Sequence, residues 1–145
     1  MKDPYASGMF KENPYYAKSD VEGNLVVVLR GIYEDRGLEL LKAISRCVQK
    51  HEIHELIISD ERGIGAGAMV NKIAYLGFLE VSKGGVLTIG DELFWNGERL
   101  GVVAGFDETH MPNHLNIVVS CNERITGEKL GCRLGDAILF RQTKN

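Results

Sequence analysis

The residues best suited to chemistry stand together in one segment, GFDETHMPNHLNIVV at positions 105–119. Between Asp107 and His114 it contains two carboxylates, two imidazoles and an amide, and apolar runs at 101–106 and 115–119 flank it. Loops held between rigid strands commonly carry binding and catalytic groups. The segment therefore predicts a binding or catalytic loop that joins two buried strands.

Acid-base catalysis is the first chemistry that these residue types suggest. A carboxylate bonded to Nδ1 of an imidazole would fix the tautomer of the ring and leave Nε2 free to transfer protons near neutral pH. The candidate catalytic residues are the carboxylates and imidazoles of the loop, namely Asp107, Glu108, His110 and His114.

Strand alternation adds candidate substrate-binding residues to this loop. If residues 114–119 are extended, His114, Asn116 and Val118 share one face. The other face carries Leu115, Ile117 and Val119. Polar side chains on a buried face need hydrogen-bond partners, and the preceding loop offers them. We expect Asn113 and Asn116 to hold a substrate carbonyl or a developing oxyanion.

Two alternatives remain open for the same residues. His110 and His114 with Asp107 would supply two imidazoles and one carboxylate to a metal ion. Pro112 disfavours the helix on which HxxxH spacing usually presents its ligands, so we expect no metal. We also expect no organic cofactor. In the other alternative Asp107, Thr109 and Asn113 only cap turns, and both histidines bond nearby carbonyls.

A glycine-rich segment at 60–72, DERGIGAGAMVNK, provides a second set of candidates. Its spacing matches neither the dinucleotide-binding fingerprint nor the P-loop. Glycine turns that open a helix can bind anions through backbone N–H groups, although a tight connection explains the glycines equally well. If the segment lies beside the 107–116 loop, the cations of Arg62 and Lys72 could bind a ligand carboxylate or phosphate, and Asn71 could add a hydrogen bond.

The first part of the scaffold is predicted to be β-α-β. Strands are expected at 24–31 and 55–59, where β-branched and apolar residues run together between polar or glycine breaks. Between them, residues 35–50 place apolar side chains at helical spacing. These residues are Leu38, Leu41, Ala43, Ile44, Cys47 and Val48.

The second part is predicted to be a small, mostly antiparallel, six-stranded β-barrel. Asn96-Gly97 between two strand-like runs is a strong hairpin signal, and short strands at this spacing are typical of barrels. The expected strands are 77–82, 85–90, 92–97, 99–106, 114–120 and 129–141. The sequence thus predicts an α+β single domain over 1–145, with an extended arm at 1–22, the β-α-β segment at 23–76 and the barrel at 77–141.

Composition limits the partners of the protein. The 145 residues carry a net charge of −3 and no long basic run, which argues against nucleic acid and anionic membranes. No signal-peptide h-region or membrane-length apolar run is present. The three cysteines form no CxxC pair, as expected for reduced thiols in a cytoplasmic protein. We expect a small-molecule ligand.

The aromatic residues of the N-terminal arm suggest an interface. Amphipathic aromatics favour contact surfaces, so the arm is expected to pack along its own domain or to cross to a second subunit of a homo-oligomer. These residues are Tyr5, Phe10, Tyr15 and Tyr16.

Residues 84–141 run GGVLTIGDELFWNGERLGVVAGF, then the asparagine-histidine segment into HLNIVV, then a closing LGDAILF. This order resembles the glucitol/sorbitol-specific IIA component of the bacterial phosphotransferase system, which implies a similar barrel. In that family the phosphorylated histidine lies in the segment leading into the barrel, and here residues 69–83 contain no histidine. The whole chain resembles an uncharacterised bacterial family that carries the FDETHMPNHLNI phrase, which implies no activity.

Two functional hypotheses follow. In the first, the protein is an acid-base enzyme of the lyase, isomerase or hydrolase type that uses the histidine-containing loop. In the second, it is a non-catalytic metabolite-binding or accessory domain related to phosphotransferase carriers.

Overall fold

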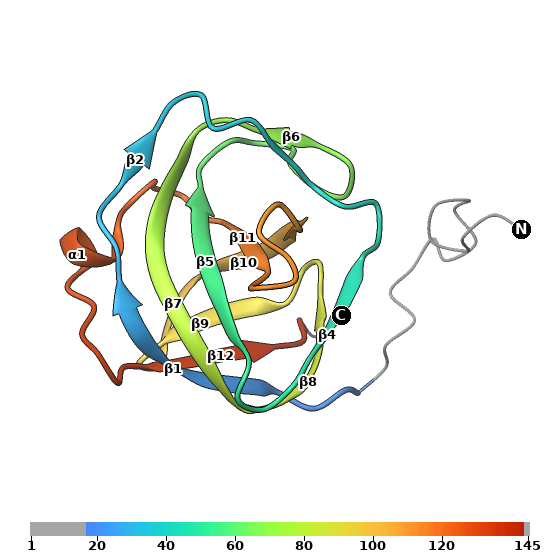
Figure 1. The fold of residues 1–145 in the computed structure, drawn as a ribbon, viewed down its shortest axis with the longest axis vertical. Helices are drawn as coiled ribbons and strands as arrows, with labels where there is room; N and C mark the ends of the chain where they lie inside the picture. The colour runs from blue at the N-terminus through green and yellow to red at the C-terminus, as the bar shows by residue number, and fades with distance from the viewer. Residues whose placement is uncertain (1–16, 144–145) are drawn as a thin grey trace, which may run out of the picture.

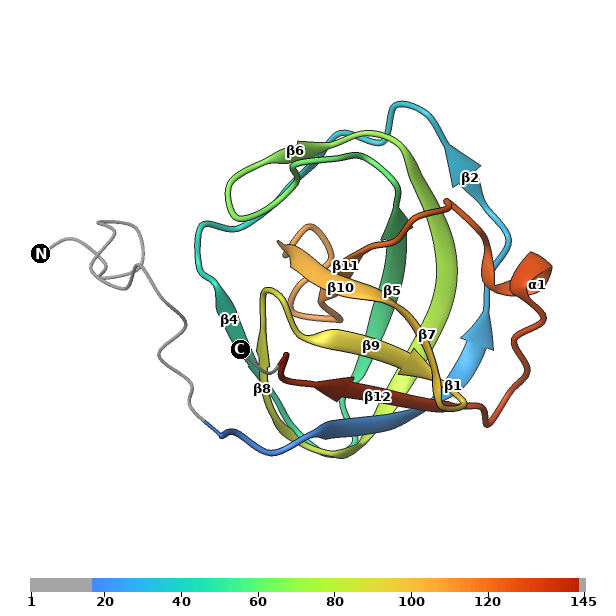
Figure 2. The same ribbon diagram turned by 180° about the vertical axis from the view of Figure 1, so that it is seen from behind.

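A computed structural model describes residues 17–143, and nearly all of its regular elements are strands (Figures 1 and 2). Seven strands form a continuous sheet, and pairing of the first with the last closes it into a ring. In ring order they are β1 (Val21–Val28), β12 (Ala137–Arg141), β9 (Glu92–Trp95), β10 (Glu98–Asp107), β11 (Asn116–Ser120), β5 (Ile53–Ser59) and β7 (Ile73–Lys83).

Shorter elements cover the outside and one side of this ring. The two-residue β2 (Ile32–Tyr33) extends the sheet beside β7. Two further pairs form separate small sheets, and one short helix packs against β7. These elements are β3 (Leu38–Glu39) with β6 (Met69–Val70), β4 (Ser45–Val48) with β8 (Gly85–Thr88), and α1 (Gly127–Leu130).

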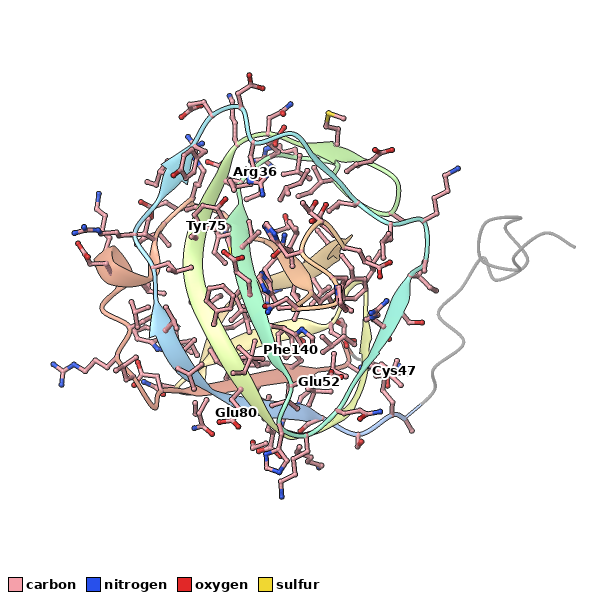
Figure 3. The ribbon with its side chains drawn as sticks, viewed as in Figure 1. Arg36, Cys47, Glu52, Tyr75, Glu80 and Phe140 are labelled. Atoms are coloured by element: carbon pink, nitrogen blue, oxygen red, sulfur yellow. The ribbon has the colours of Figure 1, made fainter. Side chains whose placement is uncertain are left out.

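Strands β5 and β11 form the only parallel pair among the described strands, and they are buried on both faces. Ile58 belongs to the larger apolar cluster, to which all seven ring strands contribute, whereas Ile57 belongs to a second cluster on the outer face. On β11, Val119 and Val118 divide between the clusters in the same way, as the predicted alternation requires. Figure 3 shows Phe140 of the larger cluster within the ring. Burial on both faces explains why both strands read as nearly continuous apolar runs.

The predicted α+β class is wrong, because residues 35–50 form no helix. They contain β3 and β4 joined by turns, and Gly37 has a φ of +68°. Leu38 and Leu40 are 1% and 2% exposed in the outer cluster, while Glu39 between them is exposed. The side chains of β3 thus alternate with a period of two. Because β4 follows after a short connection, the apolar residues of the two segments together imitated a helical spacing.

The predicted fold, a β-α-β segment followed by a six-stranded barrel, is also wrong. Strands β1 and β5 from the N-terminal part pair with β12, β7 and β11, so the ring interleaves both halves of the chain. Residues 129–141 are not one strand, because α1 ends at the left-handed Gly131 before β12 begins. Most of the predicted arm, residues 1–16, lies outside the described residues, and Val21 already belongs to β1.

The predicted hairpin at Asn96-Gly97 is confirmed. The two residues have φ values of 47° and 83° and connect β9 to β10. Positive φ at both central positions is the geometry of a type I′ turn, whose twist matches that of the flanking strands.

Closure of the ring depends on a close approach between β1 and β7. A Cβ added at Gly77 would overlap the carbonyl oxygen of Val27, so only glycine allows the strands to pair there. We expect Gly77→Ala to lower the free energy of unfolding by about 1–3 kcal/mol, the usual cost of forcing an extra carbon into a packed site. Urea unfolding measures the change.

Gly65→Ala is the matched control, because nothing lies within 4 Å of its added Cβ and its φ is not positive. Equal stability of the two variants would contradict the importance of this approach.

Candidate functional site

Three polar side chains lie side by side across the ends of β10, β11 and β5. Asp107 is opposite Asn116 in the β10–β11 ladder, and Asn116 is opposite Glu55 in the β11–β5 ladder. The residues are only 4%, 0% and 7% exposed, respectively. Burial of polar groups is costly unless each finds a partner, so their hydrogen bonds determine what this row can do.

Asp107 is fully occupied in holding the loop. One carboxylate oxygen accepts hydrogen bonds from the backbone N–H of Thr109 at 3.0 Å and from the Asn116 amide at 2.9 Å. The other accepts the Thr109 hydroxyl at 2.9 Å. No hydrogen bond among the described residues joins Asp107 to an imidazole, so the geometry matches the turn-capping alternative for this residue.

Glu108 and His110 lie on the outer side of the loop. Both are exposed, and Glu108 accepts a hydrogen bond from Arg46 at 3.2 Å. The His110 ring stacks on that of His114, with centroids 5.0 Å apart. Because His110 is the exposed member of the pair, it covers His114 on the solvent side.

His114 points inward from the loop and contacts a residue of β5. Its Nδ1 lies 2.8 Å from the Asn113 side-chain oxygen, which accepts, so the ring carries its proton on Nδ1. The unprotonated Nε2 is buried, has no hydrogen-bond partner among residues 17–143, and lies 3.4 Å from Glu55 Oε1. Phe78, opposite Glu55 in the β5–β7 ladder, packs edge-on against the imidazole.

Burial sets the protonation of this pair. It raises the pKa of Glu55 to about 7, against the opposing effect of Arg36. It also lowers the pKa of His114, an effect to which His110 and His54 add. Both shifts favour the neutral forms, so the contact is better described as a carboxylic acid facing an imidazole lone pair than as a salt bridge.

His54 fixes the end of the loop against β5. Its Nδ1 accepts the backbone N–H of Leu115 at 2.9 Å, so its proton is on Nε2, which donates to Glu52 at 2.9 Å. This pair of hydrogen bonds sets both the tautomer and the ring orientation. His54 therefore positions Leu115, the residue next to His114, but its own hydrogen bonds do not reach Glu55.

Asn116 differs from the role predicted for it. Its amide N–H₂ donates to Asp107, while its side-chain oxygen is buried and has no partner among the described residues. The free group is therefore an acceptor, which suits a ligand hydroxyl or N–H rather than an oxyanion.

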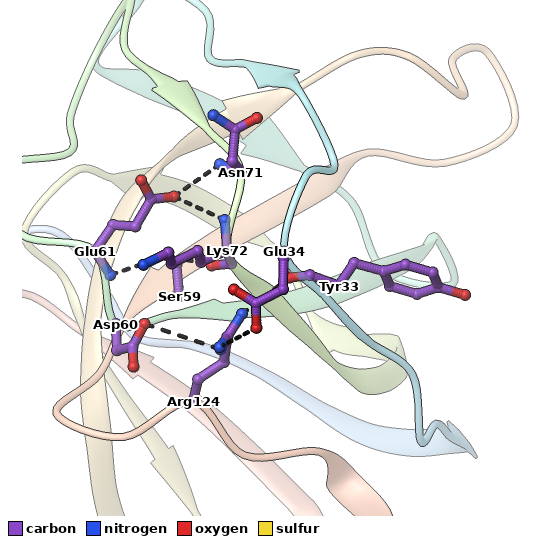
Figure 4. Close-up of polar contacts among 8 residues, drawn as sticks. All are labelled: Tyr33, Glu34, Ser59, Asp60, Glu61, Asn71, Lys72 and Arg124. Carbon is purple, nitrogen blue, oxygen red and sulfur yellow. Dashed lines mark hydrogen bonds and ion pairs between the residues drawn. The ribbon is translucent and has the colours of Figure 1, made fainter.

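The three residues predicted from the glycine-rich segment form no hydrogen bond or ion pair with the 107–116 loop. Figure 4 shows two of them, Asn71 and Lys72, beside Glu61 instead. The Asn71 side-chain oxygen accepts from Gly37, and the backbone N–H groups of Asn71 and Lys72 donate to Glu61. Arg62 lines a separate cleft at the far end of β5. The segment also continues into β6 and β7, so no helix N-terminus is formed there.

Sequence reasoning missed Glu55 and His54. Both lie in HEIHELIIS, where two polar residues begin an otherwise apolar strand. That pattern was a usable signal, because a carboxylate at the start of a strand buried on both faces must be neutral or paired.

The metal alternative gains no geometric support. Among residues 17–143, no group of three or more histidine, cysteine, aspartate and glutamate side chains is arranged to hold a metal ion. The described hydrogen bonds of Asp107 go to Thr109 and Asn116, and none joins it to His110 or His114. Within the same residues, no helix has the length and apolar character that a membrane span requires.

Comparison with known proteins identifies a family but no activity. Neither a curated protein nor a solved structure matches the chain, so the resemblance to the phosphotransferase component stays unconfirmed. One family model matches residues 15–141, which is most of the chain. The protein therefore belongs to the family described as "Family of unknown function (DUF6917)".

Proposed function

We propose that this protein is an enzyme that moves protons on a small polar molecule, with Glu55 and His114 as its acid-base pair. The observation that carries the proposal is the 3.4 Å approach of Glu55 Oε1 to the unpartnered, buried Nε2 of His114. A carboxyl with a pKa of about 7 is half protonated near neutral pH, which suits a general acid or base. Glu55 takes the role that the sequence suggested for the loop carboxylates.

The neutral pair can carry out a balanced double proton transfer. His114 Nε2 takes a proton from the substrate while the Glu55 carboxylic acid gives one to it, which leaves an imidazolium and a carboxylate. A proton then passes from Nε2 to the carboxylate and restores the starting forms. The net reaction is an isomerisation, or an elimination if a leaving group accepts the donated proton, and it needs no other reactant.

Neighbouring residues would orient the substrate and limit its access. The free side-chain oxygen of Asn116, the register partner of Glu55, can accept an O–H or N–H of the bound molecule. Asn113 and His54 hold the loop so that Nε2 of His114 faces β5. Because His110 stacks over His114, we expect it to move when substrate enters.

The decisive experiment combines a ligand screen with variants of the pair. A library of small hydroxy and amino compounds is screened against the full chain by thermal shift, and hits are followed by NMR for isomerised or dehydrated products. We expect Glu55→Gln and His114→Gln to slow turnover by about 10²–10⁴-fold, the usual contribution of a general acid or base.

Glu98→Gln and His51→Asn are the matched controls, because both residues are exposed, and asparagine tolerates the positive φ of position 51. Unchanged turnover in the Glu55 and His114 variants would refute the proposal. Tight ligand binding without turnover in the wild-type protein would refute catalysis and favour the metabolite-binding hypothesis.

The raised pKa of Glu55 also predicts how stability depends on pH. Between pH 4.5 and about 7 the folded carboxyl keeps a proton that the unfolded chain has lost. Its stabilising contribution is therefore complete below pH 4.5 and is lost as the pH rises through 7. The loss is about 3 kcal/mol at 1.36 kcal/mol per pKa unit.

Urea unfolding of the wild type and of Glu55→Gln from pH 4.5 to 8 measures this difference. The stability of the variant relative to wild type should rise across that range, because glutamine cannot ionise, whereas Glu98→Gln should track the wild type. A constant difference would show that Glu55 titrates normally in the folded protein.

The small-molecule partner and the homo-oligomer expected from the sequence stay predictions, as does the cytoplasmic location.

A further inference from the structure

A second polar site lies at the opposite end of β5 and β11. A cleft of about 310 Å³ opens between the turn after β5 and the start of β10, across the end of β11. Ser59 is opposite Ser120 at this end, four residues from the Glu55–Asn116 pair. At about 3.3 Å per residue the two sites are roughly 13 Å apart, so the cleft is distinct from the acid-base pair.

The carboxylates that line the cleft are already engaged (Figure 4). One oxygen of Glu61 accepts the backbone N–H groups of Asn71 and Lys72 at 2.7 and 2.9 Å. Asp60 lies 4.0 Å from the guanidinium of Arg124. Each carboxylate thus has one oxygen that faces a donor outside the cleft, and Arg124 is shared between Asp60 and Glu34, which lies nearer to it at 2.8 Å.

The cations of the cleft are less occupied. Arg62 is one of the residues that line the cleft, and it is exposed and has no hydrogen-bond or ion-pair partner for its side chain among residues 17–143. Arg99, at the start of β10, also lines the cleft. Its Nε donates to Glu92 at 2.6 Å, and its two terminal nitrogens have no described partner. Guanidinium groups with free nitrogens bind carboxylates and phosphates in a bidentate manner.

The backbone of the turn adds further donors. The N–H groups of Arg62 and Gly63 have no acceptor among the described residues, and Gly63 has a φ of +73°. Successive free N–H groups in a turn form a concave nest that attracts anions. Ser120 and Asn122 also line the cleft, and their side chains have no described hydrogen-bond partner.

We propose that this cleft binds a small oxyanion, a phosphate or a carboxylate group, between the guanidinium of Arg62 and the N–H groups of the 62–63 turn. Arg99 approaches the anion from the β10 side. The inference rests on the set of unpaired donors around the cavity, and it holds whether or not Glu55 and His114 are catalytic.

The test is a ¹⁵N-NMR titration of the full chain with inorganic phosphate at pH 7.5, with sodium chloride adjusted to constant ionic strength. A parallel titration uses acetate. We expect saturable shifts of the Arg62 and Gly63 amide signals, and we expect Arg62→Ala to weaken binding about tenfold or more, as loss of a charged hydrogen bond does.

Arg30→Ala is the matched control, because Arg30 is also exposed and without a described partner but does not line the cleft. Tighter binding of phosphate or of acetate would identify which oxyanion the site prefers, and either supports the proposal. Absence of saturable shifts, or equal affinity in Arg62→Ala and Arg30→Ala, would overturn it. Arg99→Ala, which should weaken binding without removing the nest, provides a second variant if Arg62→Ala does not fold.

Discussion

The parallel pairing of β5 with β11 is the constraint on which the rest of the structure depends. It places Glu55 opposite Asn116 at one end and Ser59 opposite Ser120 at the other, and so positions both proposed sites. A slip of one residue would exchange the faces of a strand and move its apolar side chains out of their clusters. Because β5 and β11 are buried on both faces, a slip of β5 or of β11 would be costly. The register between the two strands is therefore strongly specified.

The same double burial makes Glu55 chemically unusual. In an exposed strand its carboxylate would be solvated, but here it lies in a layer that continues into Ile57 and Val118. The fold accommodates the residue by favouring its neutral form and by placing an imidazole lone pair beside it. Asp107, in the same row, accepts three hydrogen bonds, which offset the cost of burying its carboxyl group. The two carboxyl groups of the row thus differ in their partners, because hydrogen bonds hold Asp107 whereas Glu55 faces the His114 imidazole.

Local patterns predicted local structure well and distant pairing poorly. The ELIIS and NIVV strands and the Asn96-Gly97 hairpin could be identified because their signals lie within a few residues. The helix at 35–50 was predicted wrongly because the alternation of Leu38, Glu39 and Leu40 covers only three residues, and the pairing with β6 that buries the two leucines is distant in sequence. The loop around His114 was found from its composition, but Glu55 was missed because the chain brings it there across about sixty residues.

Closure of the ring has a consequence for how the protein folds. Val21 in β1 pairs with Phe140 in β12, so one seam of the sheet joins the two ends of the described chain. Contacts this distant in sequence require loop closure before they stabilise anything, and folds dominated by them are slow to form. During synthesis β1 must wait until the last strand has left the ribosome before both of its neighbours are available. A chain that is cut short before β12 leaves the edges of β1 and β9 unpaired, and open strand edges of that kind promote aggregation.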